Sequence, residues 1–140
     1  MPTTAPPIAP ATPPFAPATL AELDRRLRDE LDRLIRIGAA GRSDLEAVAV
    51  EGDVSDLLDV DEPDGGTDEL ARQRARVLVA LSDRGVRDVQ DALDRLHRRT
   101  YGWCEACGDR IPLDRLRALP AATRCAPCQV APSWSLRQAG

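Results

Sequence analysis

Hydrophobic residues recur at helical spacing over two long stretches of this chain, and the first covers residues 19–50. Its leucines follow one another at steps of three and four residues: Leu20, Leu23, Leu27, Leu31 and Leu34. Charged residues fill positions between them, so the pattern predicts an amphipathic helix with one apolar stripe. Thr19 and Glu22 have the spacing of a capping box, in which each side chain bonds the other residue's free backbone N–H. The sequence therefore predicts that this helix begins at Thr19.

Two glycines, Gly38 and Gly41, fall in the middle of the first stretch. Each costs a helix about 1 kcal/mol relative to alanine. Ser43 and Glu46 repeat the capping-box spacing just after them, where a new helix could start. We therefore expect a bent or restarted helix that runs to about residue 50.

The second stretch covers residues 67–99 and has apolar residues at similar spacing: Leu70, Val77, Leu78, Leu81, Val89, Leu93 and Leu96. Asp68 and Glu69 lie in its first turn, where the helix dipole favours negative charge. Gly102 follows its last turn, as is common at a helix C-terminus. The pattern predicts a second amphipathic helix. Gly85 falls on its apolar side, where it either allows close helix contact or loosens the helix.

Neither helix can bury its apolar stripe alone, and the two stretches are nearly equal in length. Folding them antiparallel around residues 51–66 would bury both stripes. That segment ends in Asp61-Glu62-Pro63-Asp64-Gly65-Gly66, which is typical of a turn. The predicted fold class is mainly α, with a long antiparallel coiled-coil hairpin over residues 19–100 and a small base over residues 101–130.

The two ends of the chain differ from this pattern. Residues 1–18 contain seven prolines and no apolar periodicity, so we expect a solvated, polyproline-like leader, with a proline-recognising partner as the alternative. Residues 131–140 are expected to form a tail. The 140 residues include few aromatics, namely Phe15, Tyr101, Trp103 and Trp134, which favours an elongated helical protein over a large globular core. The chain has no apolar run long enough to cross a membrane, and its first residues do not resemble a signal peptide.

Charge is sorted along the chain, although the net charge is only −4. Residues 51–69 carry nine acidic residues and no basic one, whereas residues 70–140 carry thirteen arginines against seven acids. All 19 basic residues are arginine, a bias that GC-rich codons explain more simply than function does. The far end of the predicted hairpin is therefore negative.

The four cysteines, Cys104, Cys107, Cys125 and Cys128, form two C-x2-C pairs separated by seventeen residues. Two such pairs supply the four tetrahedral ligands that Zn²⁺ prefers, and an all-thiolate set leaves no open position for a substrate. We therefore predict one structural zinc ion. Disulfides would need an oxidising compartment, and a redox-active pair would need a thioredoxin-like context that this sequence lacks. Thiolates that hold zinc indicate a reducing interior, so a cytoplasmic protein is expected.

The residues around the cysteines carry a longer pattern. It runs through Tyr101, Gly102, Trp103, Cys104, Glu105, Ala106, Cys107 and Gly108, then Ile111, Arg115, Leu116, Ala118, Pro120, Ala122, Cys125, Cys128 and Gln129. This pattern resembles the finger of the DksA/TraR family, whose members share YGxCxxCGxxI followed by RLxAxPxAxxCxxC. Every position is filled at the expected spacing. Tyr101, Ile111 and Leu116 would pack around the metal loop, and Gly108 suits the tight turn after the first pair.

The resemblance implies a protein that binds RNA polymerase directly and inserts a helical hairpin through the secondary channel of the polymerase. Members of the longer branch place an Asp-x-x-Asp-x-Ala tip near the catalytic centre. This chain has Asp61-x-x-Asp64-x-Gly66 at the same distance before Cys104, so the resemblance assigns Asp61 and Asp64 to a polymerase-regulating tip. Gly66 stands where the family has alanine. From the residues alone, both aspartates are also ordinary turn residues.

The alarmone ppGpp binds well-known family members between polymerase and basic residues of the second helix and finger. The matching positions here are Leu81, Asp88, Leu119 and Gln129, and none of them is basic. The resemblance therefore does not carry ppGpp over as a partner.

The predicted function is a zinc-binding transcription regulator that acts on RNA polymerase. The alternative is a DNA-binding zinc finger, because residues 98–124 carry six arginines against three acids. The negative net charge and the acidic segment 51–69 argue against direct sequence-specific DNA contact. A family member that binds polymerase without regulating it is a further alternative.

A thiol oxidoreductase using Cys104 and Cys107 is the enzymatic alternative. The lone histidine, His97, is more typical of a helix end, where its charge suits the dipole, than of a general base. The sequence indicates no paired carboxylates in a cleft, no phosphate-binding glycine loop and no nucleophile constellation, so we do not predict an enzyme.

Overall fold

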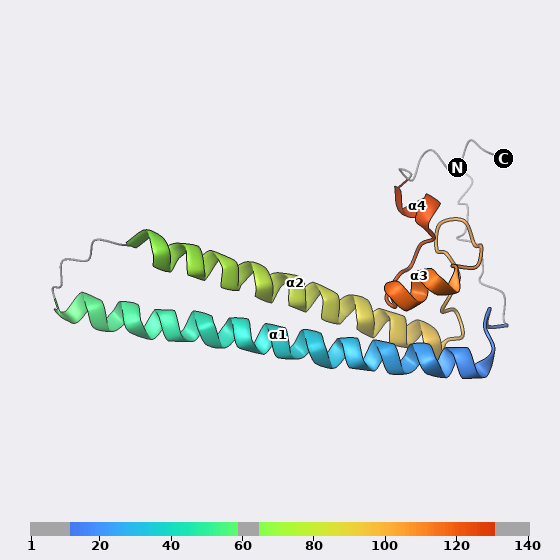
Figure 1. The fold of residues 1–140 in the computed structure, drawn as a ribbon, viewed down its shortest axis with the longest axis horizontal. Helices are drawn as coiled ribbons and strands as arrows, with labels where there is room; N and C mark the ends of the chain where they lie inside the picture. Colours follow the sequence, from blue (N-terminus) through green and yellow to red (C-terminus); the bar gives the residue numbers. More distant parts are fainter. Residues whose placement is uncertain (1–11, 59–64, 131–140) are drawn as a thin grey trace, which may run out of the picture. The chain divides into compact units, whose positions relative to one another are not determined.

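The computed structural model describes residues 12–58 and 65–130. Within these ranges the chain forms the helices α1 (Pro17–Leu58), α2 (Gly65–His97), α3 (Leu113–Ala118) and α4 (Ala126–Val130). α1 and α2 lie side by side and run in opposite directions (Figure 1). The described ranges contain no strand, only an isolated antiparallel bridge between Trp103 and Arg110. The predicted fold class, mainly α with a helical hairpin and a small cysteine-bearing base, is confirmed.

The chain divides into two compact units, and both long helices contribute to each. One unit holds the described residues up to Glu30 together with those from Asp88 onward, and we call it the base unit. The other holds Leu31–Arg87, and we call it the hairpin unit. No helix in the described part of the chain has both the length and the apolar character needed to cross a membrane.

α1 begins at Pro17, ahead of the predicted start at Thr19. Proline suits a first helical position because the N–H it lacks would have no partner there, and its φ is already helical. Thr19 therefore lies inside the first turn, and the predicted capping box is wrong. The Glu22 carboxylate instead accepts hydrogen bonds from Arg26 and Arg117.

α1 continues unbroken through Gly38 and Gly41 and ends at Leu58, so the predicted restart and the predicted end near residue 50 are both wrong. Both glycines are buried. A Cβ at Gly38 would lie 2.9 Å from Ser82 Oγ, and one at Gly41 would lie 2.9 Å from Val79 Cγ2. The glycines thus let α1 and α2 approach closely, and this packing stabilises a helix that propensity alone would weaken. Because α1 extends so far, much of the predicted turn segment 51–66 is helical.

The α2 residues buried in the hairpin unit are small. Ala75 is 6% exposed and Ser82 is 3% exposed, and the Ser82 hydroxyl donates a hydrogen bond to the carbonyl oxygen of Leu34. A Cβ at Gly85 would lie 2.9 Å from Leu34 Cδ1, which confirms the close-contact alternative for that glycine. Larger residues of the predicted stripe are instead exposed by about half: Leu70 47%, Val77 56%, Leu78 48% and Leu81 62%. Helices that meet over glycines leave little room for leucine between them, so burial of these four residues was predicted wrongly.

We expect Gly41→Leu to destabilise the protein by about 1–3 kcal/mol, the usual cost of overpacking a filled interface. A side chain at position 41 would contact the Val79 side chain. Its Cβ would also lie 3.4 Å from the carbonyl oxygen of Ala75, which is a backbone atom and cannot move aside by a change of rotamer. Urea denaturation followed by circular dichroism measures the free energy of unfolding. Ala40→Leu, at the exposed neighbouring position, is the matched control and should change it little. Equal destabilisation by both variants would contradict the close-approach interpretation.

The base unit has its own core, formed where the start of α1 meets the end of α2. Leu23, Leu27 and Ala92 are fully buried and Val89 is 3% exposed, which confirms these leucines and Val89 as stripe residues. His97 is the last residue of α2 and its Nδ1 lies 2.8 Å from the carbonyl oxygen of Leu93, so its ring contacts its own helix.

α2 ends in a Schellman motif that the sequence did not indicate. The N–H of Thr100 donates to the carbonyl oxygen of Arg95 at 2.9 Å, and the N–H of Arg99 donates to that of Leu96 at 3.1 Å. Arg99 adopts the left-handed conformation with φ +61, at the position where glycine is most common. The predicted terminating glycine, Gly102, follows the motif and serves another purpose, described below.

Candidate metal centre

The first cysteine pair sits on a tight loop, residues 102–111, which we call the knuckle loop. Its two arms are joined by the bridge between Trp103 and Arg110 and by a hydrogen bond from the N–H of Ile111 to the carbonyl oxygen of Gly102, at 2.8 Å. Nearer the turn, the N–H of Cys104 donates to the carbonyl oxygen of Asp109, also at 2.8 Å. These bonds fix the backbone that presents the first two cysteines.

The turn itself follows the predicted pattern. The N–H of Gly108 donates to the carbonyl oxygen of Cys104 at 2.9 Å, and Gly108 has φ +77, a conformation that side chains disfavour. The predicted role of Gly108 in a tight turn is therefore confirmed.

The second cysteine pair is placed by α4. Cys125 directly precedes this short helix, and its carbonyl oxygen accepts a hydrogen bond from the N–H of Gln129 at 3.0 Å. Cys128 lies within α4 and is 2% exposed. The N–H of Glu105 donates to the carbonyl oxygen of Thr123 at 2.9 Å, which joins the knuckle loop to the segment that leads into the second pair.

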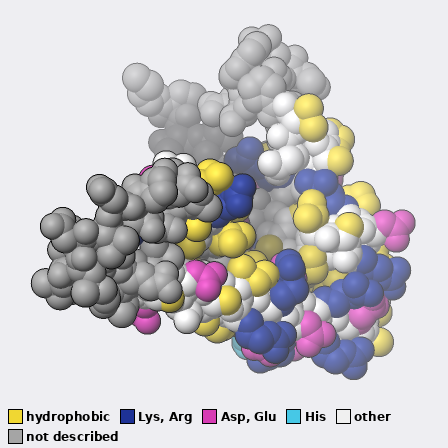
Figure 2. Space-filling view, turned by 60° about the vertical axis from the view of Figure 1, so that its left-hand side comes forward, with side chains coloured by type: hydrophobic (Ala, Val, Ile, Leu, Met, Phe, Trp, Pro, Cys, Tyr) yellow, Lys and Arg dark blue, Asp and Glu magenta, His cyan; other side chains and the backbone are white. Residues whose placement is uncertain are grey.

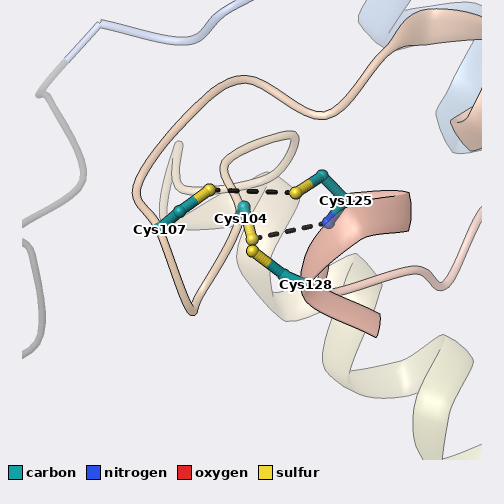
Figure 3. Close-up of side chains that lie close together, drawn as sticks. All are labelled: Cys104, Cys107, Cys125 and Cys128. Carbon is teal, nitrogen blue, oxygen red and sulfur yellow. Dashed lines mark hydrogen bonds between the residues drawn. The ribbon is translucent and has the colours of Figure 1, made fainter. Parts of the chain in front are cut away.

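The four side chains converge on one point (Figure 3). All four Sγ atoms lie within 4.8 Å of one another, and the Sγ atoms of Cys107 and Cys125 are 3.8 Å apart. Four sulfurs around a tetrahedral zinc at about 2.3 Å would stand about 3.8 Å from one another. The N–H of Cys125 also donates to the sulfur of Cys104 at 3.4 Å, an interaction that favours a thiolate. The donor set and its spacing therefore fit one zinc ion.

The protonation of the metal-free thiols differs from one cysteine to the next. Burial raises the pKa of Cys104, but backbone N–H groups of Cys107, Cys125 and Ala106 outweigh burial and lower that pKa to about 6. Although Cys107 is the exposed cysteine, partial desolvation of its thiol and hydrogen bonds with Cys104 and Cys125 raise its pKa to about 11. A bound cation holds every ligand as a thiolate, so zinc uptake releases protons, and acid competes with zinc for these sulfurs.

Three buried side chains of the finger form the packing around the knuckle loop. Tyr101 is 1% exposed, and Ile111 and Leu116 are fully buried, which confirms the predicted packing around the metal loop. The Tyr101 hydroxyl donates to the carbonyl oxygen of Pro120 at 2.7 Å. Burial raises the pKa of Tyr101 to about 12, although the positive charge of Arg95 opposes this shift, so the hydroxyl stays a donor at neutral pH.

Arg95 is a supporting residue that the sequence did not single out. Its guanidinium donates to the carbonyl oxygens of Ala121 and Ala122 at 3.3 and 3.4 Å, and it lies 5.8 Å from the centroid of the Tyr101 ring. Burial lowers its pKa, yet an arginine remains charged at neutral pH. Arg95 thus ties α2 to the segment that leads to Cys125.

A second link joins α3 to α1. Arg117 makes a bidentate contact with Glu22, with Nε and a terminal nitrogen each 3.1 Å from a carboxylate oxygen, and Arg26 also reaches Glu22 at 3.2 Å. The hydrogen bond from Arg117 is the main reason that the pKa of Glu22 lies below its ordinary value. This contact explains why Glu22 is not available for the predicted capping box.

The predicted tip residues, Asp61 and Asp64, lie outside the described residues, so their assignment stays a prediction. Among the described residues, the group of His, Cys, Asp and Glu that could hold a metal consists of the four cysteines, and His97 is not part of it.

Three of the six arginines in residues 98–124 have partners within the protein. Arg110 lies over the Phe15 ring, Arg115 donates to the carbonyl oxygen of Arg124, and Arg117 pairs with Glu22. Figure 2 shows arginine side chains with carboxylates among them on the drawn face, where hydrophobic side chains are also exposed. The basic character of this segment therefore serves internal contacts to a considerable extent.

Residues 99–131 match the sequence model of the prokaryotic dksA/traR C4-type zinc finger. All four clustered cysteines fall within this range, so residues 99–131 match a C4-type zinc finger whose four cysteines could bind one zinc ion.

Two curated relatives match part of the chain. An uncharacterized protein of Aquifex aeolicus (strain VF5) is 39% identical over 62 residues, which cover 44% of this chain and 40% of that protein. The uncharacterized protein YteA of Bacillus subtilis (strain 168) is 39% identical over 59 residues, which cover 41% of this chain and 25% of YteA. The matched part thus spans less than half the length of either relative.

A solved structure matches most of the chain. The structure of transcription factor DksA2 from Pseudomonas aeruginosa superposes with a TM-score of 0.68 over 89% of this chain and 88% of that chain, at 24% sequence identity. At this identity the likeness shows the fold. The finger match over residues 99–131 confirms the resemblance to the DksA/TraR family that the cysteine-rich segment indicated.

Proposed function

We propose that this protein is a zinc-binding transcription regulator that binds RNA polymerase and inserts the tip of its hairpin into the secondary channel to modulate initiation. The supporting observation is that one chain combines a dksA/traR-type finger over residues 99–131 with the fold of the transcription factor DksA2. The protein would work in the cytoplasm and act by binding, without a catalytic site of its own.

The physical basis of the proposal is the shape of an antiparallel helix pair. Two helices side by side are narrow enough to enter a channel that would exclude a globular domain. The segment between α1 and α2 contains Asp61 and Asp64. Carboxylates brought close to a metal-dependent active site would change its local charge balance, and the lifetime of promoter complexes with it, without any contact to DNA bases.

The proposal does not include ppGpp. The positions matched to its basic contacts are Leu81, Asp88, Leu119 and Gln129, all exposed and none positively charged. A highly charged anion would find no counter-charge at these four positions.

Direct DNA binding has weaker support. The arginines of residues 98–124 are partly committed to contacts inside the protein, as described above, and the net charge of the chain is −4. A phosphate-binding surface needs a concentration of free positive charge.

Zinc-loaded protein is expected to be retained by immobilised core RNA polymerase and to be displaced by a known secondary-channel factor. Naked duplex DNA at the same salt concentration is the control, and little binding to it is expected. Salt-sensitive DNA binding without polymerase binding would reject the proposal in favour of the DNA-binding finger. Polymerase binding that leaves transcription unchanged would identify a competitor that occupies the channel without regulating.

A further inference from the structure

The segment just before α1 packs against both arms of the knuckle loop. On the first arm, a Cβ at Gly102 would lie 2.7 Å from Phe15 Cε2 and 2.7 Å from Pro14 Cγ, so these two side chains rest directly on the Gly102 backbone. Gly102 also has φ +92, so no other residue would fit there without strain. On the second arm, the guanidinium carbon of Arg110 lies 5.4 Å from the centroid of the Phe15 ring.

These contacts meet where the two arms are joined. Gly102 accepts the hydrogen bond from Ile111, and Arg110 forms the bridge with Trp103. Phe15 therefore contacts both arms of the knuckle loop near the point where they are joined. The turn of the same loop presents Cys104 and Cys107. We propose that Phe15, together with Pro14, is a clamp that holds the knuckle loop closed and sets the rate at which the finger loses zinc.

The proposal follows from what zinc release requires. Cys107 is the exposed ligand of the four, so a competing chelator can approach the metal on this side. Cys104 and Cys107 leave the metal more easily when the two arms of the loop can shift relative to each other. That opening breaks the contacts of Phe15 with Gly102 or with Arg110, so these contacts stabilise the closed loop and not the open one.

The clamp is not simply one part of a continuous core. A cavity of about 350 Å³ adjoins the same segment and is lined by Pro13, Pro17, Leu20, Leu96, Arg99 and Tyr101. Pro13 borders this cavity, whereas Pro14 and Phe15 contact the knuckle loop directly. The sequence placed these residues in a solvated leader, yet Phe15 is half-buried and Pro17 already belongs to α1.

The test measures zinc release and does not depend on polymerase binding. Full-length, zinc-loaded protein is mixed with an excess of the chelating dye 4-(2-pyridylazo)resorcinol, and the absorbance of the zinc complex is followed with time. Phe15→Ala is expected to release zinc about threefold to tenfold faster than the parent, in keeping with the loss of a cation–π contact and its apolar packing. Circular dichroism should show the same helix content in both.

Two further variants separate a clamp from general loosening. Leu119→Ala removes an apolar side chain of the same finger that is 55% exposed, and its release rate is expected to match the parent. Arg110→Gln removes the cation over Phe15 and leaves the ring in place, so release should be about two to three times faster. In the double variant Phe15→Ala/Arg110→Gln, release should be no faster than in Phe15→Ala alone, because the second change removes a contact that is already lost.

A release rate unchanged by Phe15→Ala would overturn the proposal, as would an equal acceleration by Leu119→Ala. Should Phe15→Ala fail to fold, Arg110→Gln decides the matter. In that case, faster release supports the clamp and the parent rate overturns it.

Discussion

The Cys128→Ser variant is expected to lose tight zinc binding and several kcal/mol of stability. Cys128 is 2% exposed and its sulfur belongs to the cluster of four, so the change leaves three thiolates and a buried hydroxyl that is a poor zinc ligand. Structural zinc sites of this kind carry apparent binding free energies of about 10–16 kcal/mol, and that energy is coupled to folding. The knuckle loop and α4, which zinc would join through the four thiolates, should lose their structure first.

Zinc per chain by atomic absorption and the thermal midpoint by circular dichroism measure this effect. Ala106→Ser is the matched control, because it adds the same hydroxyl at an exposed position between Cys104 and Cys107 and leaves all four ligands intact. One zinc per chain and an unchanged midpoint in Cys128→Ser would contradict the four-ligand site.

Lowering the pH should weaken zinc binding by the parent protein, as the Cys128→Ser substitution does. Zinc binding needs thiolates, and partial desolvation together with the neighbouring thiols raises the pKa of the metal-free Cys107 to about 11, so this thiol carries a proton at neutral pH that zinc must displace. The apparent zinc affinity should therefore fall as the pH falls. Below about 6, where the metal-free Cys104 is also protonated, it should fall more steeply.

Features that depend on local pattern could be predicted from the sequence. The two long helices follow from leucine spacing, and the zinc site follows from two C-x2-C pairs, because each leucine step and each cysteine pair is a pattern of residues close together in the sequence. The apolar support from Tyr101, Ile111 and Leu116 followed from the family pattern around the cysteines.

Features that depend on the partner helix could not be predicted in this way. Ser82 is buried against α1, whereas its neighbour Leu81 is exposed. Ser82 packs on the backbone of α1 at Gly38, where the close approach of the helices leaves space only for a small side chain, and Gly38 lies far away in sequence. Helix propensity alone predicted that Gly38 and Gly41 would weaken the first helix, whereas in the structure these glycines are where α1 and α2 make close contact. The capping box failed for the same reason, because Arg117 on α3 takes the carboxylate of Glu22.

Contacts between the N-terminal leader and the knuckle loop are even harder to predict from the sequence. Phe15 stands in a proline-rich segment with no periodicity, and Arg110 looks like one more arginine of a basic finger. Their pairing becomes visible only when the chain folds and brings them within 5.4 Å. Phe15 is the one aromatic residue of the leader and was the available signal, since solvated segments seldom carry aromatic side chains.

The paired substitution Asp61→Asn/Asp64→Asn is expected to remove the regulatory effect on transcription while leaving polymerase binding and the fold intact. Both aspartates belong to the segment between α1 and α2, and the proposed function places that segment near the catalytic centre of the polymerase. Asparagine keeps the size and turn preference of aspartate but removes the charge, so the substitution isolates the electrostatic contribution. Any change in the half-life of open promoter complexes caused by the parent should fall to background in the variant.

The half-life is measured with purified polymerase by challenging preformed open complexes with heparin, and a parallel pull-down measures binding. The double substitution Asp44→Asn/Glu46→Gln is the matched control, because it removes two negative charges from exposed positions on α1 and should leave regulation unchanged. If the tip variant is as active as the parent, Asp61 and Asp64 are ordinary turn residues without a regulatory role. Equal loss in the tip variant and the control would mean that overall negative charge, rather than the position of these two carboxylates, drives the effect. Loss confined to the tip variant, with binding preserved, would separate docking by the protein from regulation by its tip.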